Sequence, residues 1–343
     1  MPGVGKPALL AMTMFTAGLS ASSALGQDAD HLQRCLATGG LGADVVIREC
    51  TAAIAAGGHA LPALYLSRAD TYLRKGDYDR ALANYDEAVK LAPNTALAFA
   101  LRGEVRARRG DYDGAIADYE RAIELEPNLA PAFSNRGLAW AGKGELRLAI
   151  ADYTKAIQLD PGLSVAFNNR GIARTAMRQH EAAIADYGEA IRLDPKYVNA
   201  YENRANAYLQ KREYDRAIAD FTAALRVQQA DRVALLGRCR AYTFAGQLPA
   251  AVADCNELLR LQPGDAAALN VRGLAHLKAG QAEKAIVDFD AVLRSDPKNV
   301  GSLYGRGLAR LKKHEAVQGN ADIAAAKALK PDVEQDFVKY NIR

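Results

Sequence analysis

Residues 130–163 read APAFSNRGLAWAGKGELRLAIADYTKAIQLDPGL, and the pattern of this stretch returns along most of the chain. A proline recurs at a fixed spacing of 34 residues, at Pro93, Pro127, Pro161, Pro195, Pro263, Pro297 and Pro331. Gln229 stands at the one step of this series that lacks a proline. A period of this length, held without insertion or deletion, indicates a stacked helical repeat.

Counting each proline as position 32 divides the chain into eight units: 62–95, 96–129, 130–163, 164–197, 198–231, 232–265, 266–299 and 300–333. Position 8 is mostly Gly or Ala, position 20 is mostly Ala, position 24 is mostly aromatic and position 27 is mostly Ala. Positions 20, 24 and 27 share one face of a helix, and a glycine such as Gly144 marks a turn before it. Each unit is therefore predicted to be two antiparallel helices, of which the proline ends the second.

The pattern from Asn135-Arg136-Gly137 through Gly144 and Ala149 to Pro161 resembles the tetratricopeptide repeat. The resemblance extends over residues 62–333 and implies an all-α fold, a right-handed superhelical solenoid of antiparallel helix pairs whose first helices line a concave groove. It also implies a scaffold that binds peptides or proteins, without catalysis. We expect residues 27–61 to form a degenerate helix pair and residues 334–343 to form a capping helix, because terminal units need a polar outer face.

Position 7 is Arg in all eight units, and position 23 is Asp in seven of them, with Asn84 in the first. We predict structural ion pairs that orient the two helices of a unit, because the fork of a guanidinium group matches a carboxylate. Four of these predicted pairs are Arg102–Asp118, Arg136–Asp152, Arg170–Asp186 and Arg204–Asp220. The alternative is a row of guanidinium groups that faces an acidic ligand.

Four cysteines fit the same frame. Cys239 and Cys255 hold positions 8 and 24 of one unit, and Cys35 and Cys50 take equivalent places if one residue is deleted from the turn between them. Successive pairs stack about 10 Å apart, which is too far for a disulfide across several units. The sequence predicts the disulfides Cys35–Cys50 and Cys239–Cys255, with four buried thiols as the alternative. No histidine stands at ligand spacing beside either pair, which disfavours a metal site.

The first residues have the pattern of a secretory signal peptide. Lys6 precedes an apolar run over residues 8–17, and the small residues of Ala24-Leu25-Gly26 suit cleavage before Gln27. We therefore expect a signal peptide at residues 1–26 and a periplasmic or secreted mature protein without a membrane span. A membrane anchor that stays attached is the alternative, although the run is short for a span of about 20 residues.

Composition and motifs disfavour several other functions. The net charge is only +4 and basic residues alternate with acidic ones, whereas a nucleic-acid binder needs a clustered basic face. The glycines follow the repeat and do not form a phosphate loop, and the five histidines occupy unrelated positions. We predict no catalytic residue, no metal and no cofactor; an active site assembled between units is the alternative.

The resemblance assigns the groove to positions 2, 5, 6, 9, 12 and 13 of the first helices, where the units differ most. The candidate groove residues are Asp70, Glu104, Asn135, Asn168, Asn169, Glu202, Asn203, Asn206, Arg240, Asn270 and Tyr304. We expect the partner to be a peptide or an envelope protein that binds in extended form. Neutral drift of exposed residues explains the same variation, and a self-associating structural oligomer is the alternative function.

Overall fold

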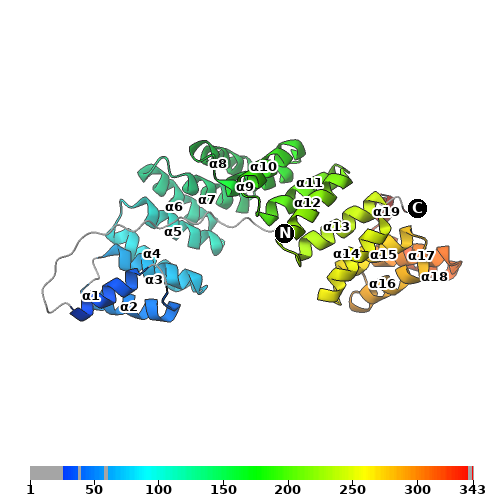
Figure 1. Cartoon of the computed structure of the whole chain (residues 1–343), viewed down its shortest axis with the longest axis horizontal. Helices are drawn as coiled ribbons and strands as arrows, with labels where there is room; N and C mark the ends of the chain where they lie inside the picture. Colours follow the sequence, from blue (N-terminus) through cyan, green and yellow to red (C-terminus); the bar gives the residue numbers. More distant parts are fainter. Residues whose placement is uncertain (1–25, 38–39, 58–60, 339–341, 343) are drawn as a thin grey trace. The chain divides into compact units, whose positions relative to one another are not determined.

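A computed structural model describes residues 26–37, 40–57, 61–338 and 342 (Figure 1). Within these ranges all regular secondary structure is helical. The helices of the first half are α1(Gly26–Leu36), α2(Ala43–Ala55), α3(Pro62–Arg74), α4(Tyr78–Leu91), α5(Ala96–Arg108), α6(Tyr112–Leu125), α7(Ala130–Gly142), α8(Leu146–Leu159) and α9(Ser164–Ala176). Those of the second half are α10(His180–Leu193), α11(Val198–Gln210), α12(Tyr214–Val227), α13(Arg232–Ala245), α14(Leu248–Leu261), α15(Ala266–Lys278), α16(Ala282–Ser295), α17(Val300–Lys312), α18(Ala316–Leu329) and α19(Val333–Val338).

The helix boundaries follow the 34-residue period. Every predicted unit from 62 onward begins with the first residue of a helix, from Pro62 in α3 to Val300 in α17. The second helix of each unit ends ahead of position 32, where the proline stands in seven units, as Leu159 does before Pro161. The all-α fold of antiparallel helix pairs predicted from the sequence is therefore confirmed.

The turn between the two helices of a unit requires a left-handed backbone conformation. Five of the turn glycines have φ between 75° and 84°, among them Gly144 at 84°. Three units place Arg178, Arg212 and His314 at the same position, with φ of 61°, 62° and 64°. This backbone region strains most side chains, so the turn is retained in these units because the packing of the helices on either side demands it.

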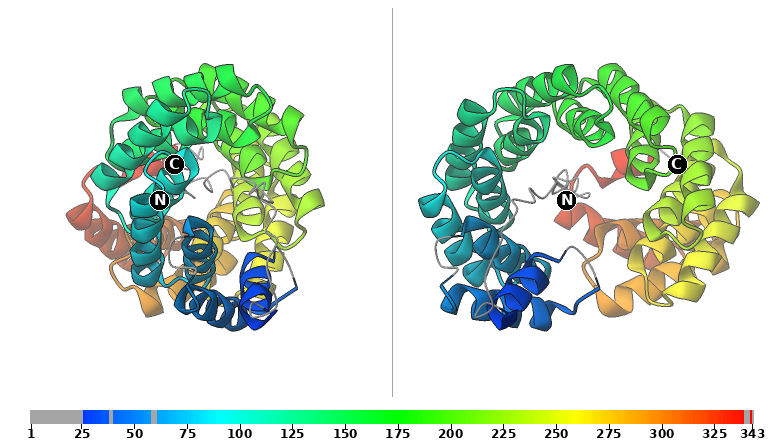
Figure 2. Two further views of the ribbon diagram at one scale, coloured as in Figure 1. Left: turned by 90° about the vertical axis from the view of Figure 1, so that its left-hand side faces the viewer. Right: turned by 60° about the vertical axis from the view of Figure 1, so that its left-hand side comes forward.

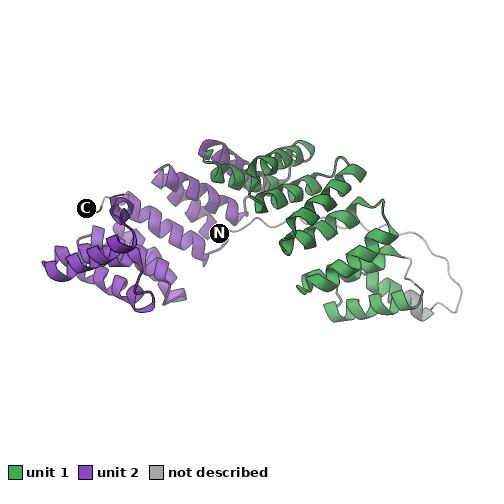
Figure 3. Ribbon diagram, turned by 180° about the vertical axis from the view of Figure 1, so that it is seen from behind, with its two compact units in different colours: residues 1–179 green, residues 180–343 purple. Residues whose placement is uncertain are grey.

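The chain divides into two compact units, shown in different colours in Figure 3: unit 1, Met1–Gln179, and unit 2, His180–Arg343. The boundary falls inside the fourth repeat, in the turn between α9 and α10. That turn is one of those in which an arginine, Arg178, replaces the glycine.

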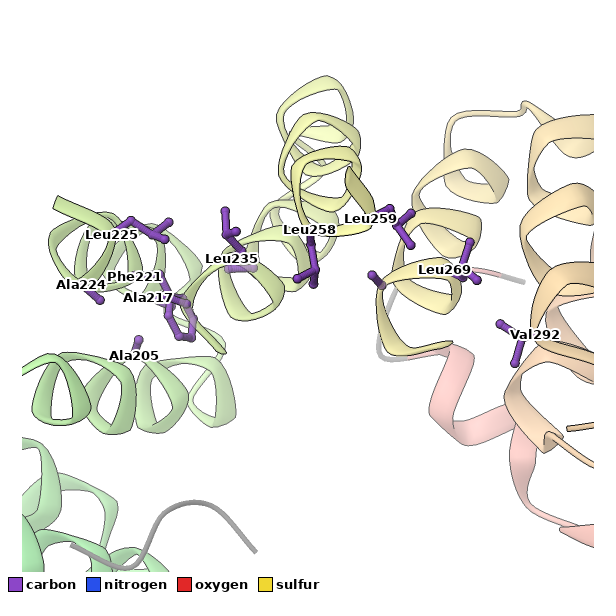
Figure 4. Packing of buried hydrophobic residues seen from close by; sticks show 13 residues of the cluster. Ala205, Ala217, Phe221, Ala224, Leu225, Leu235, Leu258, Leu259, Leu269 and Val292 are labelled. Carbon is purple, nitrogen blue, oxygen red and sulfur yellow. The ribbon is translucent and has the colours of Figure 1, made fainter. Parts of the chain in front are cut away.

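Small residues and aromatic rings fill the interior between helices. In unit 2, Phe221 of α12 is fully buried together with Ala205 of α11 and Ala217 (Figure 4). A Cβ atom placed on Gly237 of α13 would lie 2.3 Å from the ring of Phe221. The ring therefore occupies the space that a side chain at position 237 would need, which explains why a glycine stands there.

Within each unit the first helices of the repeats lie on the inner side of the curve and the second helices lie outside (Figure 2). Neighbouring first helices contact one another, as α7 does with α9 and α13 with α15. We call positions 2, 5, 6, 9, 12 and 13 of α3, α5, α7 and α9 the inner face of unit 1. The same positions of α11, α13, α15 and α17 form the inner face of unit 2.

Candidate functional site

The structure brings each predicted cysteine pair to disulfide distance. The sulfur atoms of Cys35 and Cys50 are 2.02 Å apart, and those of Cys239 and Cys255 are 2.11 Å apart. All four side chains are fully buried. Each pair joins the two helices of one repeat, at the place where the other units pack an aromatic ring on a small residue.

The structure also brings together the arginines of position 7 and the aspartates of position 23. Arg136 donates from Nε and Nη2 to the two carboxylate oxygens of Asp152, at 2.8 Å each. Arg204 binds Asp220 in the same way, and Arg102 binds Asp118. The remaining such pairs within one unit are Arg238–Asp254, Arg272–Asp288 and Arg306–Asp322. Arg170 belongs to unit 1 and Asp186 to unit 2, so this pair stays a prediction.

Several of these arginines also bond to the preceding repeat, which sequence reasoning missed. Arg102 Nη1 donates to Asp86 on α4 at 2.8 Å, and Arg306 Nη1 donates to Asp290 on α16 at 2.6 Å. Other units supply neutral acceptors at the same position, such as Thr222 for Arg238 at 3.0 Å. One guanidinium group thus bonds to two other helices and links three helices in all. The sequence signal for this contact was the side-chain oxygen that recurs at position 25 of most units.

The aspartates favour the charged form of the arginines that they bind. The hydrogen bonds that Arg136 donates to Asp152 raise the pKa of Arg136, and those that Arg204 donates to Asp220 raise the pKa of Arg204. Burial raises the pKa of Asp118, but Arg102 and Arg106 oppose this effect, and Arg106 adds a hydrogen bond of 2.9 Å. Because the guanidinium groups are committed to protein acceptors, the row of arginines is not offered to a ligand.

Six of the eleven candidate groove residues are buried, and the prediction that they line an open groove is wrong for them. They are Glu104, Asn135, Asn168, Asn169, Glu202 and Tyr304, none more than 9% exposed. Five of the six stand at positions 5 and 6. Position 5 lies beside the following repeat, as Glu202 does beside Asp231, and position 6 lies against the preceding repeat, as Gly237 does against Phe221. Tyr304 is covered instead by Phe337 of α19, with the ring centroids 4.7 Å apart.

The other five candidates are partly exposed: Asp70, Asn203, Asn206, Arg240 and Asn270. Asp70 forms an ion pair with Arg74 at 2.9 Å, and the buried Glu104 forms the matching pair with Arg108 at 2.8 Å. The negative charges of these two acids are therefore neutralised by arginines one helical turn away. Asn270 accepts a short hydrogen bond from Ser302 of α17, which joins two neighbouring first helices.

Glu202, on the inner face of unit 2, has a strongly raised pKa. Its side chain is 9% exposed, and its Oε1 atom has no hydrogen-bond partner. Burial, together with the nearby carboxylate of Asp231, raises the pKa of Glu202 to about 8. Asp231 itself caps α13 by accepting the backbone N–H of Ala234 at 2.9 Å. At neutral pH Glu202 is therefore mainly protonated and adds little negative charge.

Several family models describe the chain. Models of the tetratricopeptide repeat match residues 66–130, 236–299 and 270–333, and others match residues 130–163 and 198–231. A further model described as TPR repeat matches residues 173–212. A search of curated proteins found no match. Among the described residues, helices long and apolar enough to cross a membrane are absent.

Solved structures share the fold at low sequence identity. The structure of Pseudomonas aeruginosa pilF is 21% identical and covers 62% of this chain and 96% of its own, with a TM-score of 0.55. The APC/C hetero-tetramer Cut9–Hcn1 is 17% identical, covers 93% of this chain and 64% of its own, and has a TM-score of 0.54. YrrB, described as a TPR protein with an unusual peptide-binding site, is 20% identical, covers 55% and 97%, and has a TM-score of 0.50. With these matches and the helix pairs described above, the chain belongs to the tetratricopeptide repeat family.

Proposed function

We propose that this protein is an exported, non-enzymatic scaffold that binds a peptide or a segment of an envelope protein on its inner faces. The observation that carries the proposal is the contrast between two sets of positions on the first helices. Position 7 is invariant because its arginine binds the second helix of its own repeat and, as Arg102 does, can also bind the preceding repeat. Position 9 instead holds two acids, one amide, four aliphatic residues and one arginine, and most of them are partly exposed.

This contrast separates residues that packing fixes from residues that packing leaves free. A side chain that is partly exposed on the inner side of a curve is accessible to an extended segment of another protein. The family supports the same class of function, since tetratricopeptide repeats act as interaction scaffolds.

Photo-crosslinking tests this proposal. A photoreactive amino acid in place of Asn206 should crosslink the purified chain to a component of an envelope extract, because this position lies on the inner face. The matched control replaces Val287, which is 65% exposed on the outer helix α16. Equal crosslinking from both positions, or none from position 206, would contradict binding on the inner face. Crosslinks only to a second copy of the chain would favour a self-associating oligomer.

Export is tested separately, because it rests on different residues. The predicted cleavage before Gln27 lies next to residues 1–25, which are outside the described part of the chain. If the protein is exported, its N-terminus after secretion is Gln27, and a thiol count without reductant gives no free cysteine. An N-terminus at Met1 together with four reactive thiols after denaturation would overturn the proposed location.

A further inference from the structure

The inner faces of the two units differ in their charge balance. On the inner face of unit 1 the ionisable residues are Asp70, Glu104, Arg74 and Arg108. They form two ion pairs within single helices, Asp70 with Arg74 and Glu104 with Arg108. The inner face of unit 1 therefore has no net charge and little unpaired charge to offer to a ligand.

The inner face of unit 2 contains three basic residues, Arg240, Lys278 and Lys312, and one acidic residue, Glu202. Glu202 is buried against Asp231, which is itself engaged as the cap of α13. Among the described residues, neither Arg240 nor Lys312 has an ion pair, although both side chains are at least partly exposed. This face thus carries positive charge that the protein does not compensate.

The third basic residue, Lys278, is bound to a neighbouring first helix. Its Nζ atom donates to the carbonyl oxygens of Thr243 and Phe244 at the end of α13, at 2.9 and 3.2 Å. The bonds join α15 to α13, so position 13 lies between neighbouring first helices. Arg240 and Lys312 make no such bond in the described part of the chain, and their charged groups remain available.

Apolar side chains accompany the charges. Leu308 of α17 stands at position 9, as Arg240 does on α13, and is partly exposed. Leu236 stands one helical turn before Arg240 and is also partly exposed. A ligand that extends from α13 to α17 therefore meets the cation of Arg240 and the aliphatic side chains of Leu236 and Leu308.

We propose that the inner face of unit 2 binds an extended acidic segment of a partner protein, in which carboxylate side chains alternate with aliphatic ones. A carboxylate of the partner pairs with Arg240 in a bidentate arrangement, and the aliphatic residues pack on the partly exposed Leu236 and Leu308. This inference rests on the proposed function and specifies the chemistry of its partner.

Fluorescence anisotropy with defined probes tests the proposal. The probes are short labelled peptides, blocked at both ends, in which Leu alternates with Glu, Gln or Lys, and the protein is the purified chain. We expect the Glu peptide to bind and its affinity to fall with added salt, because screening weakens exposed charge pairs. The Gln peptide should bind about tenfold more weakly, a loss of about 1.4 kcal/mol.

Two variants of equal charge make the test specific. Arg240→Gln should weaken binding of the Glu peptide about tenfold, whereas Arg294→Gln, on the outer helix α16, should change it less than twofold. Equal loss in both variants, or equal binding of the Glu and Gln peptides, would overturn the acidic partner while leaving the binding face intact. Failure of all three peptides to bind would count against the binding face itself.

Discussion

Units 1 and 2 have the same kind of interior packing and differ on their inner faces. In both units an arginine at position 7 donates hydrogen bonds to an aspartate of its own repeat and to a side-chain oxygen of the repeat before it, as Arg102 and Arg306 do. On the inner side, unit 1 pairs its acids with its own arginines, while unit 2 leaves Arg240 without an ionic partner among the described residues. The period is kept where neighbouring helices constrain it and is lost where they do not.

If the two units are packed alike, breaking the equivalent ion pair in either unit should lower the free energy of unfolding by the same amount. Asp152→Ala in unit 1 and Asp288→Ala in unit 2 should each lower the free energy of unfolding by about 3 kcal/mol, because each leaves a largely buried guanidinium group unpaired. Asn84→Ala removes a neutral acceptor and should cost only about 1 kcal/mol. Urea titrations followed by circular dichroism measure all three. Losses that differ strongly between the two units would show that their interiors are not equivalent.

The disulfides offer a second comparison, between the first helix pair of unit 1 and an internal repeat of unit 2. Replacing Cys239 and Cys255 with Ala should lower stability by about 3 kcal/mol, as expected for a closed loop of about 15 residues. The matched double variant of Cys35 and Cys50 should cost about as much, but the loss should be confined to α1 and α2. Hydrogen exchange resolved along the chain tells these cases apart. No loss in either variant would mean that the bridges contribute nothing to stability.

At position 6, Gly237 of unit 2 can be compared with Asn135 of unit 1. Gly237→Ala in unit 2 should cost about 1–3 kcal/mol, since the new Cβ would overlap the ring of Phe221 in a packed interior. Asn135→Ala in unit 1 should change stability by less than about 0.5 kcal/mol or raise it, because the buried Nδ2 atom of Asn135 has no hydrogen-bond partner. Thermal unfolding of both variants provides the measurement. A larger loss for Asn135→Ala would contradict the packing described for these units.

Position 5 gives unit 2 a pH dependence that unit 1 lacks, because Ser134 stands where unit 2 has Glu202. The pKa of Glu202 is raised to about 8, so the folded state keeps a proton that the unfolded state releases above its pKa of about 4.5. The contribution of Glu202 to stability is complete below that value and is lost as the pH rises to about 8. Between pH 7 and pH 8 the loss should be about 1 kcal/mol. Glu202→Gln should remove this part of the pH dependence, and an unchanged profile in the variant would contradict it.

The sequence was enough to predict the helix pairs, because Gly137, Tyr153 and the prolines mark contacts that every repeat must make. The arginine pairs and the cysteine pairs could be placed for the same reason, since their positions face each other within one repeat. The inner face could not be read in this way. Whether Asn168 or Glu202 is exposed depends on how closely one first helix approaches the next, and neither residue type reveals that distance, because both are usually found at surfaces. The division of the chain into two units after Gln179 could not be predicted either, since the 34-residue spacing continues across it.

Arg238 and Arg240 allow the most direct test of the account, because they are two residues apart on α13 and are assigned opposite roles. Arg238 binds Asp254 at 2.7 and 2.8 Å, while Arg240 lies on the inner face without an ionic partner in the described part of the chain. The measurement is the urea midpoint and the affinity for the Glu–Leu peptide, taken on Arg238→Ala and Arg240→Ala side by side. We expect Arg238→Ala to lose about 3 kcal/mol of stability and, while folded, to keep its affinity. We expect Arg240→Ala to keep its stability and to lose affinity about tenfold. Loss of affinity in Arg238→Ala with none in Arg240→Ala would contradict it.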